Sequence, residues 1–221
     1  MKTIMPAHLA LYLADAMLAA VSPDTMTPVI TGIHLERDGK KLRATATDRY
    51  RVHEVTLADA KTTGDGGEHH IMPSGALRWL KRTMPIVAPR RADRASATVT
   101  LRTTGTGEDR SIVVNIETAD GNAASYITKT ITGNFPPLHR LFEIAEKAER
   151  WTGDVAYKPT FLGSLAALLP GRDYTQPRLK QTAAESTDGK PATKPGPILA
   201  TAGDGDRITA RALIQPNLIL R

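Results

Sequence analysis

The 221-residue chain contains no cysteine. This absence excludes disulfide bonds, thiolate metal sites and cysteine nucleophiles, and it is typical of proteins that work in the reducing cytosol. Aromatic residues are also scarce, at 5% of the chain, although hydrophobic residues together reach 41%. We therefore expect a core of ordinary size, filled mainly by Leu, Ile, Val, Met and Ala.

No apolar run in the sequence is long enough to cross a bilayer. The longest, Leu9–Val21, is interrupted by Asp15, whereas a transmembrane helix needs about 20 predominantly apolar residues. The N-terminal residues also lack the basic segment, apolar stretch and cleavage site of an export signal. The expectation is a cytoplasmic protein that does not associate with membranes.

The net charge of +6 is unevenly distributed. Residues 1–65 carry eight basic and eight acidic side chains, whereas residues 78–94 carry six basic side chains and one acidic one. The basic residues of this second segment are Arg78, Lys81, Arg82, Arg90, Arg91 and Arg94. Such a cluster favours a polyanionic partner such as nucleic acid. It is equally consistent with a solvated helix face followed by a basic loop.

Hydrophobic periodicity predicts one helix followed by three antiparallel strands, in units of roughly 70 residues that recur three times. Ser74 is expected to cap the second helix and Pro85 to end it. The predicted helices are 6–21, 74–84, 138–151 and 159–169. The predicted strands are 29–37, 42–47, 51–57, 97–103, 111–117, 124–130, 178–184, 198–202 and 207–214, with short strands at 69–72 and 154–157.

This order predicts an α+β fold in which the helices pack on one face of antiparallel sheets. A single unit buries its sheet poorly, so we expect the first two units to pair and place two helices on a common sheet face. Residues 1–135 would form this complete domain, and residues 136–221 an abbreviated one with a linking helix and a single unit. Residues 186–197 have no apolar side chain beyond Ala and Pro and are predicted to be a mobile hairpin loop.

Catalytic and metal-binding motifs are not evident. The glycines at 105–107 lack the lysine of a phosphate-binding loop. His69 and His70 are adjacent on a predicted strand, so their side chains should point to opposite faces. Asp204-Gly205-Asp206 lacks the other ligands of a calcium loop. The sequence therefore favours a protein that is not an enzyme and that uses no metal or cofactor.

Four short segments carry a resemblance to a known family. They are Ala46–Val52, which reads Ala-Thr-Asp-Arg-Tyr-Arg-Val within 31–57; His70–Pro73, which leads into a helix; Gly133–Arg140, which contains Gly-Asn-Phe-Pro; and the terminal Ala212–Leu218. Their residues and their order resemble the middle and last domains of the bacterial sliding clamp, the beta subunit of DNA polymerase III.

The resemblance implies a DNA-clamp fold and a role as a replication processivity factor that tethers a DNA polymerase or another DNA enzyme to duplex DNA. It implies sequence-independent DNA contacts through the six basic residues of 78–94. It also implies an inter-domain groove in which a partner protein docks a short linear segment, with a Leu or Phe as buried anchor. The matching positions are Ile30, Thr47, Arg49, Tyr50, Arg51, Val52, Leu213, Ile214, Pro216 and Leu218. From the residues alone, Val52, Leu213 and Ile214 are equally consistent with ordinary core positions.

The sequence also departs from the family. The family's first domain has no counterpart, and the three strands expected directly after the helix at 138–151 are absent. Only the second predicted helix has the basic face that a clamp turns toward DNA, because the first and fourth predicted helices carry no basic residue. One hypothesis is a reduced clamp, encoded by a phage or another mobile element, that forms a homo-oligomeric ring. The alternative is a non-encircling adaptor or regulator of a replication, transcription or site-specific recombination protein.

Overall fold

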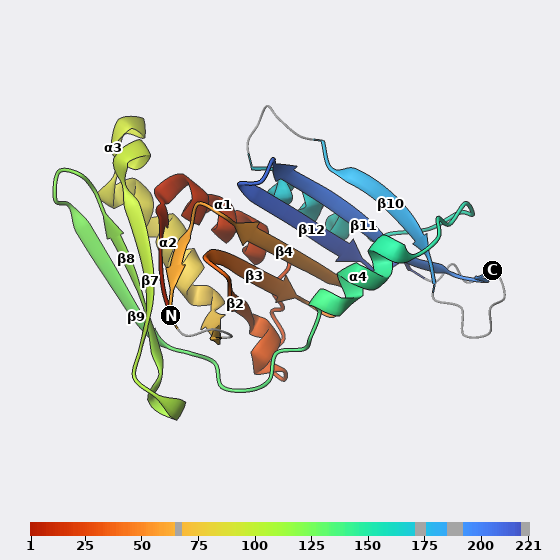
Figure 1. Cartoon of the computed structure of the whole chain (residues 1–221), viewed down its shortest axis with the longest axis horizontal. Coiled ribbons are helices and arrows are strands. Elements are labelled where there is room, and N and C mark those ends of the chain that lie inside the picture. Colours follow the sequence, from red (N-terminus) through yellow and green to blue (C-terminus); the bar gives the residue numbers. More distant parts are fainter. Residues whose placement is uncertain (65–67, 171–175, 185–191, 218–221) are drawn as a thin grey trace.

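The structure is a computed structural model that describes residues 1–64, 68–170, 176–184 and 192–217. It consists of two antiparallel sheets with helices packed against them (Figure 1). The predicted α+β class is confirmed. Most of the predicted strands form, several within one residue of their expected bounds.

The smaller sheet has five strands in the order β5-β1-β7-β8-β9. Their bounds are β5 (Lys61–Thr63), β1 (Lys2–Pro6), β7 (Thr98–Thr104), β8 (Ser111–Glu117) and β9 (Ala123–Lys129). In β8 the side chains of Ile112, Val114 and Ile116 are fully buried and alternate with partly or fully exposed ones, as expected for a sheet with one face on the core. The strand β9 forms one free edge of this sheet.

The larger sheet has seven strands in the order β10-β11-β12-β4-β3-β2-β6. Their bounds are β10 (Arg178–Ala183), β11 (Pro195–Asp204), β12 (Ile208–Ile214), β4 (Arg51–Leu57), β3 (Lys41–Thr47), β2 (Gly32–Asp38) and β6 (His69–Pro73). β12 pairs with β4 along its whole length, from Ile208 opposite Leu57 to Ile214 opposite Arg51. This pairing joins the two predicted regions, 1–135 and 136–221, into one continuous sheet.

Two neighbouring helices form the centre of the core. α1 (Ala7–Leu18) contacts β1 and β7 of the smaller sheet and β3 and β4 of the larger one, and α2 (Ser74–Val87) contacts β8, β9 and β6. Leu9, Leu13 and Met17 of α1 are buried as predicted. The two paired helices therefore lie between two sheets, each of which they cover on one face, and do not share a single sheet as the sequence suggested.

The helices differ from the prediction in several places. Ser74 makes no capping hydrogen bond, because it is the first helical residue and the chain enters the helix from the extended Pro73. Pro85 lies inside α2, which continues to Val87. The expected helix at 159–169 is divided into α5 (Pro159–Gly163) and the 3-10 helix η3 (Ser164–Leu168), and the linking helix α4 covers only His139–Lys147.

Several short elements were not predicted. These are β1, β5, the 3-10 helices η1 (Pro28–Thr31) and η2 (Gly107–Asp109), and α3 (Arg91–Ser96), which occupies the expected basic loop. α3 begins with reciprocal contacts between Arg90 and Asp93. A helix of six residues has too little hydrophobic periodicity to be recognised from sequence.

The C-terminal third also differs in detail. β11 begins at Pro195, so the predicted loop at 186–197 ends earlier than expected, and 185–191 lies outside the described residues. The predicted strand at 154–157 is reduced to an isolated bridge between Ala156 and Asn217.

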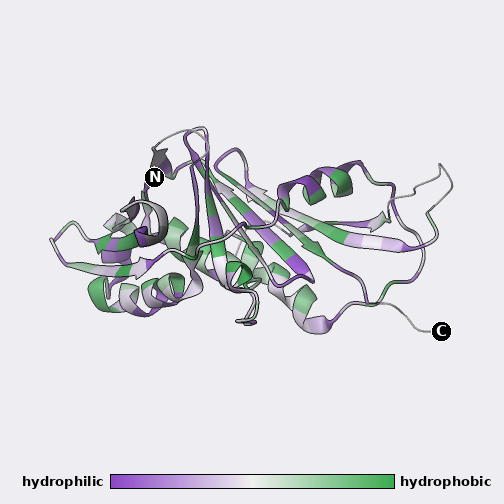
Figure 2. Cartoon of the chain, turned by 90° about the horizontal axis from the view of Figure 1, so that it is seen from below, coloured by the Kyte–Doolittle hydropathy of each residue, from purple (hydrophilic) through white to green (hydrophobic). Residues whose placement is uncertain are grey.

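The pleat of the larger sheet separates two environments. His53, Ala212 and Ile214 point toward α1 and η3 and belong to the main core, whereas Val52 and Leu213 point to the opposite face, where α4 packs (Figure 1). Apolar and polar bands alternate along these strands (Figure 2), which is the pattern expected when successive side chains point to opposite faces. We call the face under α4 the outer face and the other the inner face.

Candidate interaction groove and basic surface

A groove of about 580 Å³ opens on the outer face, between α4 and the turn that precedes β4. Seven of the predicted groove positions line it: Ile30, Thr47, Arg49, Tyr50, Arg51, Val52 and Leu213. These residues come from η1, from the end of β3, the turn after it and the start of β4, and from β12. The structure therefore brings together the two distant segments that the sequence resemblance paired.

The three remaining predicted positions do not line this groove. Ile214 is fully buried in the main core, because it points to the inner face when its neighbour Leu213 points outward. Pro216 is partly exposed but is not among the lining residues. Leu218 lies outside the described residues.

One wall of the groove was missed by the sequence interpretation. It is the apolar flank of α4 and its surroundings, with Leu138, Leu141, Ile144, Ala145 and Ala148. Leu141 and Ile144 remain 43% and 45% exposed, so this wall is open to solvent. The signal that could have revealed it is the i, i+3 spacing of Leu138, Leu141 and Ile144.

The turn between β3 and β4 holds the groove's polar rim. The carboxylate of Asp48 accepts the backbone N–H groups of Tyr50 and Arg51, at 3.1 and 3.0 Å, and its second oxygen lies 2.9 Å from Arg51 Nε. Thr47 Oγ1 accepts the Arg49 N–H at 3.1 Å and donates to the Arg51 carbonyl at 2.8 Å. This network fixes the backbone on both sides of Arg49.

Tyr50 and Arg51 both contact Phe161 of α5. The Tyr50 ring, 61% exposed, stacks on Phe161 with centroids 5.9 Å apart, and the Arg51 guanidinium carbon lies 4.8 Å from the same ring centre. The Tyr50 carbonyl accepts the N–H of Gln215 at 2.8 Å, just beyond β12. The turn is therefore braced by both α5 and the C-terminal strand.

α4 is held on the outer face by a small apolar cluster. Phe142 is fully buried among Val52, Leu199 and Leu213, and the Arg211 guanidinium carbon lies 4.6 Å from the centre of its ring. Lys180 of β10 donates to the carbonyls of Ala145 and Glu146, at 3.2 and 2.8 Å, near the C-terminal end of the helix. Cations at this end of a helix are favourable.

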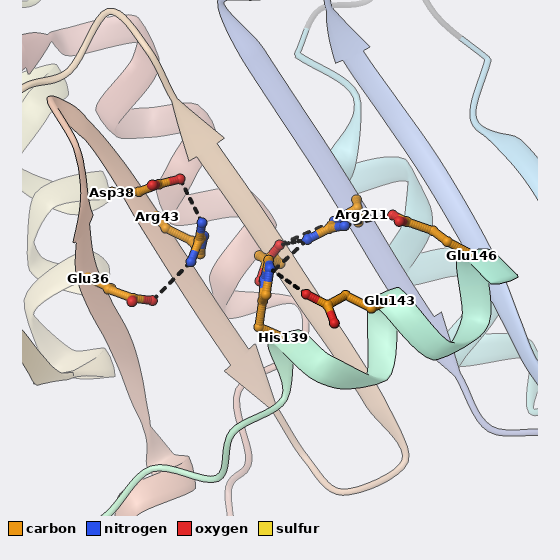
Figure 3. Close-up of polar contacts among 8 residues, drawn as sticks. Glu36, Asp38, Arg43, His139, Glu143, Glu146 and Arg211 are labelled. Atoms are coloured by element: carbon orange, nitrogen blue, oxygen red, sulfur yellow. Dashed lines mark hydrogen bonds and ion pairs between the residues drawn. The ribbon is translucent and has the colours of Figure 1, made fainter. Parts of the chain in front are cut away.

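A charged network extends from this cluster across the sheet (Figure 3). Glu54, which is 2% exposed, forms an ion pair with Arg211 and lies 3.0 Å from Nδ1 of His139. Arg211 also reaches Glu146 of α4 at 2.6 Å. Burial lowers the pKa of Arg211, but the hydrogen bonds and charges of the two glutamates outweigh it, so the net pKa is raised. Both ends of α4 are thus tied to the sheet.

Five of the six predicted DNA-binding residues lie on two consecutive helices, and the sixth, Arg90, lies between them. Arg78, Lys81 and Arg82 are exposed on the face of α2 opposite the buried Leu77 and Leu80, as the helical spacing predicts. Arg90 precedes α3, and Arg91 and Arg94 belong to it, so the expected basic loop is largely a helix.

Part of this charge is already paired. Lys81 forms an ion pair with Asp15 of α1, and Arg90 lies 3.2 Å from Asp93. Among the described residues, Arg78 and Arg82 make no ion pair within 4.0 Å. The neighbouring surface of α1 presents His8, Leu11 and Asp15, so the exposed cations are concentrated at the α2–α3 end of the helical surface.

The two adjacent histidines point to opposite faces, as predicted. His69 lies on the outer face, 3.2 Å from His34, whereas His70 is buried and 2.9 Å from Glu68. No group of three potential metal ligands occurs within 1–64, 68–170, 176–184 and 192–217. Over the same ranges, no helix is long and apolar enough to span a membrane.

Comparisons with known proteins identify the fold. Neither protein-family models nor curated protein sequences match this chain. Solved structures do. The DNA polymerase beta subunit of Streptococcus pyogenes is 15% identical, with a TM-score of 0.62 over 98% of this chain and 65% of that one.

Two further solved structures match the fold of this chain. The DNA polymerase sliding clamp of Pseudomonas aeruginosa is 14% identical, with a TM-score of 0.65 over 99% of this chain and 66% of that one. The DNA polymerase III beta subunit of Thermotoga maritima is 11% identical, with a TM-score of 0.63 over 99% and 66%. The chain thus spans slightly less than two thirds of these subunits, and its fold is that of the bacterial sliding clamps.

Proposed function

We propose that the chain is a sliding-clamp-like processivity factor that holds a DNA polymerase or another DNA enzyme on duplex DNA and is not itself an enzyme. The observation that carries this proposal is the groove on the outer face, in which two segments distant in sequence meet within a clamp fold. A partner would insert a Leu or Phe over Val52 and Leu213, between the braced turn and α4. Such a factor would act in the cytoplasm, which the lack of cysteine favours.

The exposed cations of α2 support a role in DNA binding. Arg78 and Arg82 are accessible and project from a rigid helix, and contacts to phosphate from such positions carry no sequence information and permit sliding. Substituting Arg78, Lys81 and Arg82 together with Ala should reduce the slope of log affinity against log salt concentration by about 2 to 3. Substituting Lys40 and Lys41 at the β2–β3 turn is the matched control, and its slope should stay unchanged.

The free sheet edges support assembly of a ring. β9 and β10 are edge strands at opposite ends of the molecule's long axis (Figure 1). Among the described residues, no strand pairs with the outer edge of β9. The outer edge of β10 is open only before Gln181, because Gln181 and Ala183 are bonded to Trp151 and Glu149. Each carries an exposed large aliphatic side chain, Ile127 at 67% and Leu179 at 49% exposure. Pairing of one copy's β9 with the next copy's β10 would be head-to-tail, which is the interface type that closes rings.

The decisive test is topological. The protein, loaded on nicked circular DNA in moderate salt, should remain bound through gel filtration and be lost once the DNA is linearised. Light scattering should show a species larger than a monomer. Equal retention on circular and linear DNA would contradict an encircling mechanism.

A second candidate is a non-encircling adaptor that binds a replication, transcription or recombination protein through the same groove. The observation that favours it is the uneven charge of the helical surface, where Asp15 already neutralises Lys81. A monomer in solution at tens of micromolar, combined with partner binding through the groove, would select this function over the clamp.

A further inference from the structure

We propose that Arg49 makes the groove selective for partner segments that carry a carboxylate beside their apolar anchor, and that Asp24 occupies the position of that carboxylate in the free protein. This inference rests on the proposed function of the groove as a peptide-docking site. It concerns which peptide the groove accepts.

The first argument is the charge of the groove lining. Its described lining contains two cations, Arg49 and Arg51, and no acidic residue. Arg51 is committed internally, because its side chain is 16% exposed, pairs with Asp48 at 2.9 Å and stacks on Phe161. Arg49 is 56% exposed. It is therefore the cation that an occupant can reach.

The second argument is the partner that Arg49 already has. Its Nη2 lies 3.0 Å from Oδ2 of Asp24 and also donates to Thr27 Oγ1. The other oxygen of Asp24 accepts the Met26 N–H at 3.0 Å, within the loop that runs past the groove mouth. One carboxylate oxygen thus stabilises the loop, and the other sits on the guanidinium where a ligand carboxylate would bind.

The third argument is the backbone at this position. Arg49 has φ 77°, and it is the one non-glycine residue with positive φ among those described. This conformation suits glycine and disfavours a side chain with a Cβ. A long cationic side chain held there by the Asp48 and Thr47 hydrogen bonds is the kind of outlier that points to a binding role.

The apolar part of the groove defines the rest of the occupant. Val52 and Leu213 form its floor, and Leu141 and Ile144 leave an open wall on the other side. We therefore infer an extended peptide with a bulky aliphatic or aromatic anchor on this floor and an Asp or Glu close to it in sequence. The anchor supplies the affinity, and the pair with Arg49 supplies the discrimination.

The test uses four capped octapeptides with a central Leu-Phe pair, in which the residue before or after the pair is Asp or Asn. Binding is measured by fluorescence anisotropy at about 50 mM and about 500 mM NaCl, which differ strongly in charge screening. We expect the wild type to prefer one Asp peptide over its Asn counterpart by roughly twofold to fivefold, the range for a half-exposed ion pair, and to lose most of this preference at high salt.

Three variants test whether Arg49 and Asp24 determine the preference for Asp peptides over Asn peptides. Arg49→Gly keeps the backbone conformation and should abolish the preference, so that each Asp peptide and its Asn counterpart bind equally. Asp24→Asn keeps an oxygen for the Met26 N–H but removes the competing charge, so it should strengthen binding of the Asp peptide. Arg207→Ala is the matched control: its arginine is 63% exposed and paired with Asp59 at 2.6 Å, outside the groove. Its preference should equal that of the wild type.

The outcomes distinguish a failure of the charge preference assigned to Arg49 from a failure of the groove as a docking site. Peptide binding without a charge preference, or a preference that survives in Arg49→Gly, overturns the role of Arg49 and leaves the groove as a docking site. Failure of all four peptides to bind the wild type overturns the docking site and with it this inference. Circular dichroism of each variant verifies that it is folded.

Discussion

The inner and outer faces of the seven-stranded sheet use the same strands for different purposes. On the inner face, His53, Ala212 and Ile214 are fully buried against α1 and η3. On the outer face, Val52 and Leu213 are covered by Phe142 on one side and border an open groove on the other. The inner face therefore contributes chiefly to stability, and the outer face presents a surface that is buried enough to be ordered and open enough to bind.

The neighbouring residues Ile214 and Leu213 give the largest contrast between the faces. Ile214→Ala should lower the free energy of unfolding by about 3 kcal/mol, the cost of a cavity in a closed core, and leave peptide binding unchanged in the folded fraction. Leu213→Ala should cost less, because the groove already exposes its surroundings to solvent, but should weaken peptide binding. Urea unfolding and anisotropy measure the two effects. Equal losses of binding in both variants would contradict the division into faces.

The next largest effect on stability is expected in the charged network on the outer face. Arg211→Met removes the main partner of the buried Glu54 and should cost about 2 to 3 kcal/mol, below the range for fully buried pairs because Arg211 is partly exposed and His139 remains nearby. Arg43→Met on the same face breaks pairs with the more exposed Glu36 and Asp38 and should cost less than about 1 kcal/mol. Urea midpoints compare them, and a larger loss for Arg43→Met would refute this ranking.

Acidification tests the burial of one histidine on each face. Burial lowers the pKa of His53 to about 4, and burial together with nearby positive charges does the same for His34. The unfolded chain binds more protons than the folded one between about pH 6.5 and pH 4, so stability falls as the pH is lowered through this window. Each of the two histidines should lower the free energy of unfolding by about 2 kcal/mol when the pH falls from 8 to 5.

His53→Gln should remove the contribution of His53 to this pH dependence of stability and leave the contribution of His34 unchanged. Urea unfolding of the variant and of the wild type at pH 8, 6.5 and 5 measures the difference. An unchanged slope would show that the inner-face imidazole is not held neutral.

The smallest stability effect is expected at the groove mouth. Arg49→Gly relieves a positive φ but adds freedom to the unfolded chain, so unfolding should be unchanged or less favourable by at most about 1 kcal/mol. Arg49→Ala keeps a Cβ in the same conformation and should be less stable than Arg49→Gly. The opposite order in urea unfolding would mean that the turn is not held in this conformation.

The strands were predictable because their alternation of apolar and polar residues is a local signal; β4 and β8 have their predicted bounds. β1, β5 and α3 were missed because three to six residues carry too little of that signal. Pro85 was expected to end α2, but the buried Met84 and Ala88 keep the last turn on the core.

The groove was predictable only through resemblance, since Tyr50 and Leu213 are brought together by long-range pairing of β4 and β12. The prediction of Ile214 as a groove residue was avoidable. Adjacent strand residues point to opposite faces, so Leu213 and Ile214 could not share one site. The contribution of α4 required knowing where the linking helix packs, which no local pattern supplies.

Hydrogen–deuterium exchange with and without the preferred acidic peptide locates the docking site most directly. We predict that protection increases in residues 47–52 and 138–148 and stays unchanged in residues 7–18 on the inner face. Protection confined to α1 and η3 instead would contradict the assignment of the outer face as the binding surface.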